Sequence, residues 1–419
     1  MSRRILQIAW RNLWRNPRRT LIAMAAIGLG YVMLLCFACL LAGLQQQMIK
    51  NGTSLGLSHM QVHAPAYYPD RSIYDTLGGR EGTDVSGLLT AIASAPRVRA
   101  ASLRVYGYGL VGCDDRSAGV EILGAVPTQE QQVTIFQVRL VAGRYLTEQI
   151  PQGVVIGDKL ANTIGASIGS EVVLLAQAAD GSMGNDLYTI VGIFHTGLEA
   201  VDRGLVLMSL SALQQLLSLA PDRIHEIGIA LFDATEATAV AAALEAQLGK
   251  ILPVRVRAWP ELAPQLAEYV RLHRSTSFIL FAIVFVLALI GIMNTMLMAV
   301  FERTRELGML MALGVRPAQI LGLILAETGY LVGASLVLGG GIGAPFLWYL
   351  QTYGLDLRSF MGEISLPGGS LVDPLWYGQQ NFPAYSQAAL GLAVTALVSA
   401  CYPALRAARL RPVEAIHKV

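Results

Sequence analysis

The chain has 419 residues, of which 54% are hydrophobic and 14% are charged. This composition is too apolar and too poor in charge for an ordinary soluble protein. The formal net charge of +2 gives no reason to expect a nucleic-acid partner.

The first 19 residues are predicted to form a cytoplasmic interfacial helix. Leu6, Trp10, Leu13 and Trp14 share one face of this helix, and most of its arginines lie on the other. Indole rings and arginines at the level of the lipid headgroups anchor a membrane helix that follows them. A contact surface for a partner is the alternative use of this segment.

Four apolar stretches are long enough to cross a bilayer, which takes about 20 residues in a helix. Transmembrane helices are predicted at 20–46, at 271–301 together with the end of a stalk, at 318–350 and at 384–405. Arginines mark the cytoplasmic side: there are six before residue 20 and three in 302–317, but one in the loop 351–383. Both termini, including the tail 406–419, are therefore predicted to be cytoplasmic, and 47–270 and 351–383 extracytoplasmic.

Residues 47–270 alternate between strand-like and helix-like patterns, which predicts an α+β domain of one or two lobes. Its predicted strands are His59–His63, Val98–Tyr108, Val120–Val126, Gly153–Ile156, Glu171–Leu175, Tyr188–Phe194, Leu205–Met208, Glu226–Leu231 and Ile251–Val256. Its predicted helices are Val85–Ala95, Asp158–Ile164, Ser211–Leu219 and Thr235–Leu248. The fold class is thus a membrane α-helical protein with four transmembrane helices and a large extracytoplasmic α+β domain between the first two.

The stretch from Trp259 to Arg274 is predicted to be a helical stalk that runs unbroken into the second span, with Pro264 as an alternative start. After that span, the segment 302–317 reads as a short cytoplasmic helix with its charges at the front and apolar residues behind them. It can stop at Gly314, before Pro317. Such a helix is suited to transmit a force from a cytoplasmic partner to the membrane helices. The alternative is a solvated turn whose arginines only set the membrane topology.

The third span contains two pairs of glycines at the spacing that lets helices approach closely, Gly329 with Gly333 and Gly339 with Gly343. They predict a face for helix packing or for dimer formation. Glu327 is the one charge within a span, and either a functional carboxylate or a structural hydrogen bond to a polar group such as Asn294 or Thr295 explains it. No charged partner for Glu327 is expected in the spans.

Catalytic and metal-binding patterns are absent from the sequence. Gly249-Lys250 has no glycine-rich loop before it, so the chain has no Walker-type ATP site. His59 and His63 are four residues apart, but on a strand such a pair does not converge on one metal ion. The other histidines are scattered. We therefore expect no catalytic residue, no metal site and no cofactor bound by this chain.

Short motifs at both ends of the chain carry a family resemblance. They are Ile8–Leu13 and Asn16–Thr20 before the first span, Glu302–Gly308 and Ala312–Gly314 after the second, Glu327, and the tail motifs Tyr402–Ala404 and Arg406–Ile416. Together they resemble the FtsX-like family of ABC-transporter permeases, which includes the macrolide-exporter and lipoprotein-releasing systems. Finer features such as Ser58–His63 and Val191–Phe194 look like the lipoprotein-releasing branch.

The resemblance implies a dimeric inner-membrane permease that works by mechanotransmission. A separate cytoplasmic ABC ATPase dimer would hold ATP and Mg, and its motion would reach the extracytoplasmic domain through the stalk. The ATPase-coupling residues are then Glu302, Arg303, Arg305, Glu306, Leu307, Gly308 and Leu310. The implied partners are a second permease copy or paralogue, the lipid bilayer and a periplasmic carrier or adaptor. A regulatory scaffold that activates a cell-wall hydrolase stays open as an alternative, whereas a membrane-embedded enzyme is disfavoured.

Overall fold

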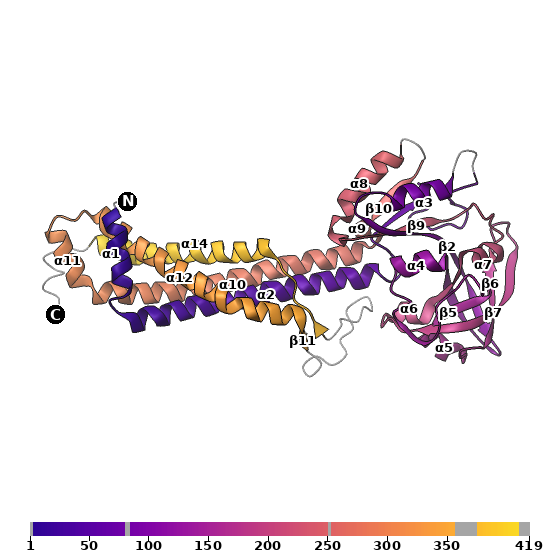
Figure 1. The fold of residues 1–419 in the computed structure, drawn as a ribbon, viewed down its shortest axis with the longest axis horizontal. Coiled ribbons are helices and arrows are strands. Elements are labelled where there is room, and N and C mark those ends of the chain that lie inside the picture. The colour runs from indigo at the N-terminus through magenta and orange to yellow at the C-terminus, as the bar shows by residue number, and fades with distance from the viewer. Residues whose placement is uncertain (1–2, 80–83, 250–252, 357–374, 410–419) are drawn as a thin grey trace. The chain divides into compact units, whose positions relative to one another are not determined.

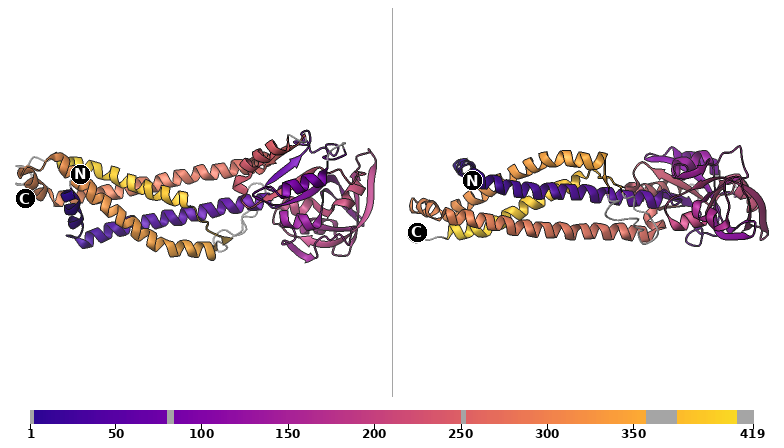
Figure 2. Two further views of the ribbon diagram at one scale, coloured as in Figure 1. Left: turned by 45° about the horizontal axis from the view of Figure 1, so that its top comes forward. Right: turned by 90° about the horizontal axis from the view of Figure 1, so that it is seen from below.

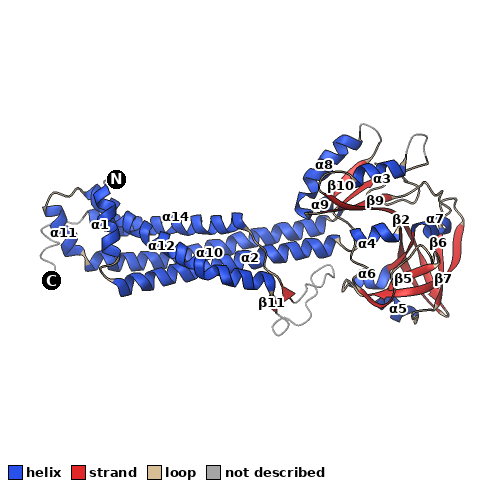
Figure 3. Cartoon of the chain, in the orientation of Figure 1, coloured by secondary structure: helices blue, strands red, loops and turns tan. Residues whose placement is uncertain are grey.

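The computed structural model describes residues 3–79, 84–249, 253–356 and 375–409. The chain divides into two compact units. Among the described residues, the helical unit comprises 3–46, 271–356 and 375–409, and the sheet unit comprises 47–79, 84–249 and 253–270. Figure 1 labels the elements along the chain, and Figure 3 shows the strands of the sheet unit in red.

The long helices of the helical unit have a proline at their first or second residue. Its elements are α1 (Arg3–Leu13), α2 (Pro17–Thr53), α10 (Pro264–Glu302), α11 (Thr304–Ala312), α12 (Pro317–Thr352), α14 (Phe382–Ala408) and the short strands β11 (Leu355–Asp356) and β12 (Leu375–Trp376). Proline suits the first turn of a helix because the amide hydrogen it lacks would have no partner there. In the described part of the chain, four helices are long and apolar enough to cross a membrane: α2, α10, α12 and α14.

Small residues let these helices pack closely, and both views in Figure 2 show the four lying side by side within the helical unit. A methyl group added at Gly339 of α12 would lie 2.8 Å from the carbonyl oxygen of Gly28 in α2. One added at Gly343 would lie 3.2 Å from Leu35 of α2. Gly339 and Gly343 therefore pack α12 against α2 within one chain.

Two segments differ from the sequence prediction. The interfacial helix is shorter than 1–19, because α1 ends at Leu13 and α2 already begins at Pro17. The stalk is not unbroken from Trp259: the short helix α9 (Trp259–Leu262) ends at Ala263, whose backbone is not helical, and α10 begins at Pro264. Residues 357–374 of the predicted loop and 410–419 of the tail lie outside the described residues.

The sheet unit carries ten strands and several short helices. The strands are β1 (Met60–His63), β2 (Val98–Cys113), β3 (Arg116–Ala125), β4 (Leu140–Gly143), β5 (Gly153–Gly157), β6 (Glu171–Gln177), β7 (Met183–Phe194), β8 (Leu205–Ser209), β9 (Glu226–Leu231) and β10 (Arg255–Ala258). The helices, besides α9, are α3 (Val85–Ala93), α4 (Pro127–Val133), α5 (Asp158–Ile164), α6 (Glu199–Gly204), α7 (Leu210–Leu216), the 3₁₀ turn η1 (Ala234–Glu236) and α8 (Ala237–Leu248).

The strand pairings form a ring with an extension. Strands β2, β3, β8, β5, β7 and β6 pair in that order, and β6 pairs back with β2. The early half of β2 instead pairs with β9, which pairs with β1, and β1 pairs with β10. The long strand β2 thus belongs to both parts, which gives the unit two lobes that share one strand.

Periodicity predicted most of these elements. The ranges of β9 and α5 coincide with the predicted ones, because each has a regular apolar pattern between clear breaks. The helices α4 and α6 and the strand β4 were not predicted. They bury few apolar side chains, so no apolar period marks them in the sequence.

Candidate functional site

The segment 302–317 folds as one short helix between two turns. The helix α10 ends at Glu302, Arg303 leaves the helical conformation, and α11 runs from Thr304 to Ala312. The hydroxyl of Thr304 donates to the carbonyl oxygens of Val300 and Phe301 and so supports the first turn. Gly314 has a φ of +89°, which glycine adopts without strain, and reverses the chain before α12.

One face of α11 is buried against the long helices. Leu307 and Gly308 are buried, and Leu307 belongs to a cluster with Val300 of α10, Ile320 of α12 and Ala404 of α14. The opposite face is exposed, with Arg305, Met309 and Leu313 in solvent or at a partner surface. The helix is therefore amphipathic, as the sequence predicted.

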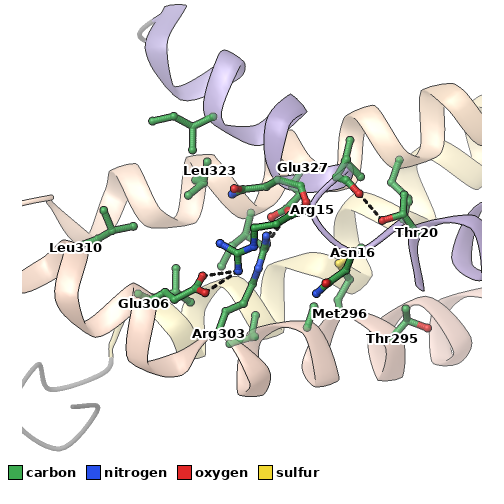
Figure 4. Close-up of a pocket in the computed structure, with 18 of the residues that line it drawn as sticks. Arg15, Asn16, Thr20, Thr295, Met296, Arg303, Glu306, Leu310, Leu323 and Glu327 are labelled. Carbon is green, nitrogen blue, oxygen red and sulfur yellow. Dashed lines mark hydrogen bonds and ion pairs between the residues drawn. The ribbon is translucent and has the colours of Figure 1, made fainter. Parts of the chain in front are cut away.

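Two ion pairs tie this segment to other helices. A guanidinium nitrogen of Arg15, in the turn between α1 and α2, lies 2.6 Å from the carboxylate of Glu306. A guanidinium nitrogen of Arg303 lies 2.7 Å from Glu327 of α12. Figure 4 shows both arginines pointing between the helices toward these carboxylates. Arg303 and Glu306 thus form ion pairs within this chain, and their coupling to an ATPase stays a prediction.

Glu327 has a charged partner, which lies outside the predicted spans, in the segment 302–317. This partner is Arg303, 24 residues earlier in the chain. The side chains of Arg303 and Glu327 are 16% and 17% exposed, whereas those of Arg15 and Glu306 are 48% and 45% exposed. Removing one partner of a largely buried pair leaves an uncompensated charge, which is costly, whereas an exposed pair contributes about 0–1 kcal/mol.

A pocket of about 410 Å³ opens between α1, α2, α10, α11 and α12 beside these pairs. Its polar edge is formed by Arg15, Arg303, Glu306 and Glu327, and apolar side chains such as Leu310 line the rest. Beside this pocket, the ion pair of Glu306 with Arg15 joins α11 to the turn after α1. The α11 segment is therefore tied to the end of α1 by a contact that water can reach.

The glycines of the third predicted span separate into two kinds. Gly339 and Gly343 are buried against α2, as described above. Gly329 and Gly333 are exposed, and an added methyl group at either would meet no described atom within 4 Å. These two leave a smooth strip on α12 that no described part of this chain covers. Asn294 is exposed on α10, and Glu327 accepts a hydrogen bond from Arg303.

The histidines of the sheet unit are largely structural. Nδ1 of His59 accepts a hydrogen bond from the Leu231 amide, and burial lowers the pKa of His59 to about 4. Nδ1 of His63 donates to the Ala64 carbonyl oxygen, and burial lowers its pKa as well. Two neutral, separately bonded imidazoles do not form the metal site that their spacing could suggest.

His195 is less isolated than the sequence suggested. Its Nδ1 lies 3.0 Å from a carboxylate oxygen of Asp158 and 3.5 Å from one of Asp202. A histidine and two carboxylates can hold a cation. Here the Asp202 carboxylate already accepts hydrogen bonds from Thr196 and from the Gly197 amide. Internal hydrogen bonds account for the cluster.

Known proteins resemble this chain over its whole length. Residues 20–247 match the MacB-like periplasmic core domain, and residues 278–412 match the FtsX-like permease C-terminal model. The lipoprotein-releasing system transmembrane protein LolC of Xylella fastidiosa (strain 9a5c) is 24% identical over 417 residues, which cover 96% of this chain and 95% of that protein. LolC of Neisseria meningitidis serogroup B is 24% identical over 95% of this chain and 93% of its own length. The macrolide export ATP-binding/permease protein MacB of Nitrobacter winogradskyi is 35% identical over 34% of this chain and 20% of its own length.

Proposed function

The chain belongs to the family of FtsX-like and MacB-like ABC-transporter permeases, and from this premise we propose that it works by mechanotransmission. It is a membrane permease subunit with an extracytoplasmic domain. ATP and Mg are bound by a separate cytoplasmic ATPase dimer, and this chain converts the motion of that dimer into work outside the inner membrane.

The observation that carries the proposal is the attachment of α11 to three helices at once. It packs on α10, α12 and α14 through Leu307, and Glu306 ties it to the turn before α2. A force on its exposed face, at Arg305 and Met309, is therefore passed to the ends of all four long helices. The ATPase docks on that face, while Arg303 and Glu306 hold the helix from within.

The arginine distribution supports a cytoplasmic position for both termini and for α11. The sheet unit then lies outside the membrane, between the first two of four spans. The strip at Gly329 and Gly333 is available to a second permease copy or paralogue, because small residues without an intrachain neighbour allow a close approach.

The substrate proposed is a lipoprotein or another amphiphile, extracted at the outer face of the inner membrane. The likeness to the lipoprotein-releasing system protein LolC extends over nearly the whole chain, which favours this class over others. A periplasmic carrier or adaptor would receive the extracted molecule, since its acyl chains need cover in water.

Reconstitution tests the proposal. The chain, a cognate ABC ATPase, any paralogous permease and a bilayer-anchored lipoprotein are placed in vesicles. We expect lipoprotein in the soluble fraction after ATP addition when a periplasmic carrier is present, and none with an ATPase that cannot hydrolyse ATP. ATP-dependent activation of a cell-wall hydrolase with no release would replace transport by the scaffold function. The proposal would be contradicted if ATP caused neither lipoprotein release nor hydrolase activation and if the ATPase did not bind to the chain.

A further inference from the structure

A row of buried polar side chains crosses three strands of the sheet unit. His63 of β1 pairs with Glu226 of β9, and Glu226 pairs with Arg104 of β2, so the three side chains lie on one face of the sheet. All three are completely buried. Charged residues are almost never fully buried unless they are paired, so this row needs an explanation.

The guanidinium group of Arg104 joins three parts of the unit. It donates two hydrogen bonds to Glu130 of α4, of 3.0 and 2.7 Å, and one of 3.2 Å to Glu226 of β9. It also donates to the backbone carbonyl oxygen of Gly56, which lies in the linker of residues 54–59 between α2 and β1. We call Arg104, Glu130, Glu226 and the Gly56 carbonyl group the linker latch.

Neighbouring groups hold the linker latch in one arrangement. The hydroxyl of Tyr106 donates to the same Glu226 oxygen, at 3.2 Å. Gly228 gives the guanidinium its place, because a methyl group there would lie 2.6 Å from Cζ of Arg104. Within the linker, the Ser58 amide donates to the Thr53 carbonyl oxygen at the end of α2, and the His59 amide donates to Ile229 of β9.

Stability alone does not account for this arrangement. A buried ion network is often no more stabilising than apolar side chains of the same size, and its best-attested use is to fix one arrangement among several. Here the fixed element is the backbone of the short linker that follows the first membrane helix. A hydrogen bond from a charged donor to that backbone defines where the end of α2 meets the sheet.

We propose that Arg104 is a positioning residue that locks the linker after α2 to β9 and α4. Movement of α2 is then passed to the sheet and is not absorbed by a change in the conformation of the linker. The inference rests on the proposed function for its consequence, since the locked linker matters only if α2 moves. The locking itself is a property of this chain alone and can be measured without an ATPase.

Arg104→Lys tests the latch while keeping its charge. One ammonium group cannot reproduce a fork to Glu130 together with bonds to Glu226 and the Gly56 carbonyl oxygen. Hydrogen–deuterium exchange of the full chain in detergent should be faster at the Ser58 and His59 amides by about tenfold, the loss expected for one hydrogen bond to a charged group. Amides in β9 and in the late half of β2 should keep their protection.

Gly228→Ala disturbs the same place without removing a charge, because its methyl group would lie 2.6 Å from Cζ of Arg104 and 2.8 Å from Oγ of Ser58 in the linker. Its result is therefore interpreted only together with that of Arg104→Lys. Ser102→Ala is the matched control. Ser102 is buried on the same face of β2, two residues from Arg104, and its hydroxyl has no hydrogen-bond partner among the described residues. Its exchange pattern should equal that of the wild type.

The same variants are then assayed with the ATPase. We expect ATP hydrolysis to stay within about twofold of wild type and lipoprotein release per ATP to fall by about tenfold, since one charge-assisted bond is lost. Faster exchange throughout β2, β9 and α4 would mean that Arg104 only stabilises the fold, and unchanged exchange in the linker would also overturn the latch. Faster exchange of the linker amides with unaltered lipoprotein release per ATP would overturn the role of Arg104 in coupling. If wild-type protein releases nothing, the proposed function fails, while the exchange result still decides the latch.

Discussion

Arginine–glutamate contacts hold distant segments together in both units of this chain, and they differ most in their access to water. Arg15 and Glu306 of the helical unit are about half exposed, whereas Arg104, Glu130 and Glu226 of the sheet unit are 0–2% exposed. Water and salt weaken the first contact, so it can open and close at little cost. The second contact is closed to water and fixes one geometry. The comparison teaches that a solvent-exposed (wet) ion pair suits a contact that opens and closes. A buried (dry) ion pair suits a contact that fixes the relative position of two segments.

The largest effect should come from breaking the dry contact. Arg104→Met leaves two carboxylates buried without their common partner, so the sheet unit should lose about 3–5 kcal/mol of its free energy of unfolding. Arg97→Met is the control, because Arg97 and its partner Glu236 are 59% and 40% exposed, and it should lose no more than about 1 kcal/mol. Protease susceptibility of the full chain in a denaturant series measures both. An equal loss of unfolding free energy in Arg104→Met and Arg97→Met would contradict the contrast between exposed and buried ion pairs.

The pair of Arg303 and Glu327 is intermediate in exposure and should be intermediate in effect. Glu327→Leu or Arg303→Met alone should cost about 2 kcal/mol, less than full burial would give. The double variant should cost less than the sum of the single ones, because it leaves no unpaired charge. Thermal unfolding in detergent completes this double-mutant cycle. Strict additivity would show that the two charges do not interact.

The glycines of α12 sharpen the comparison within the helical unit. Gly339→Leu forces a side chain against the backbone of α2 and should cost about 1–3 kcal/mol of subunit stability. Gly329→Leu meets no described atom of its own chain, so subunit stability should hold while the dimer dissociates or distorts. Size-exclusion chromatography with light scattering separates the two results. Wild-type size and activity for both Gly329→Leu and Gly333→Leu would mean that this strip faces lipid.

The wet contact should give the smallest effect on stability. Arg15→Gln removes the partner of Glu306 and should cost at most about 1 kcal/mol of the free energy of unfolding, and its difference from the wild type should vanish at high salt.

Arg305→Glu, on the outward face of α11, should leave stability unchanged and weaken co-purification of the ATPase. Retention of the ATPase with Arg305→Glu, at wild-type activity, would exclude this face as the docking surface.

Sequence patterns predicted what depends on neighbours along the chain. Apolar runs predicted the positions of the long helices, and alternation gave most strands. The pairing of Arg303 with Glu327 could not be predicted from the sequence, because it joins the residue after α10 to a residue of α12, with α11 between them. Arg104 and Glu226 are 122 residues apart, and only the pairing of β2 with β9 makes them neighbours.

One signal of the linker latch was present in the sequence. Arg104 falls on the same face of its strand as Ser102 and Tyr106, and no other residue of that strand on this face is charged. A charge at such a position in a strand buried on that face predicts a buried partner, although it does not say which one. For α11, amphipathicity predicted a buried and an exposed face, but not that Glu306 belongs to the inner one.

The central claim is that this chain transmits motion, and a hinge in α10 tests it most directly. Replacing Tyr269-Val270 by Gly-Gly costs about 1 kcal/mol per residue relative to alanine and makes the helix flexible. Ala-Ala at the same positions is the matched control, since it removes the same side chains and keeps the helix stiff. ATP hydrolysis and lipoprotein release are measured side by side in reconstituted vesicles. The account predicts normal hydrolysis for both variants and release by Ala-Ala only; release by Gly-Gly at the Ala-Ala level would contradict it.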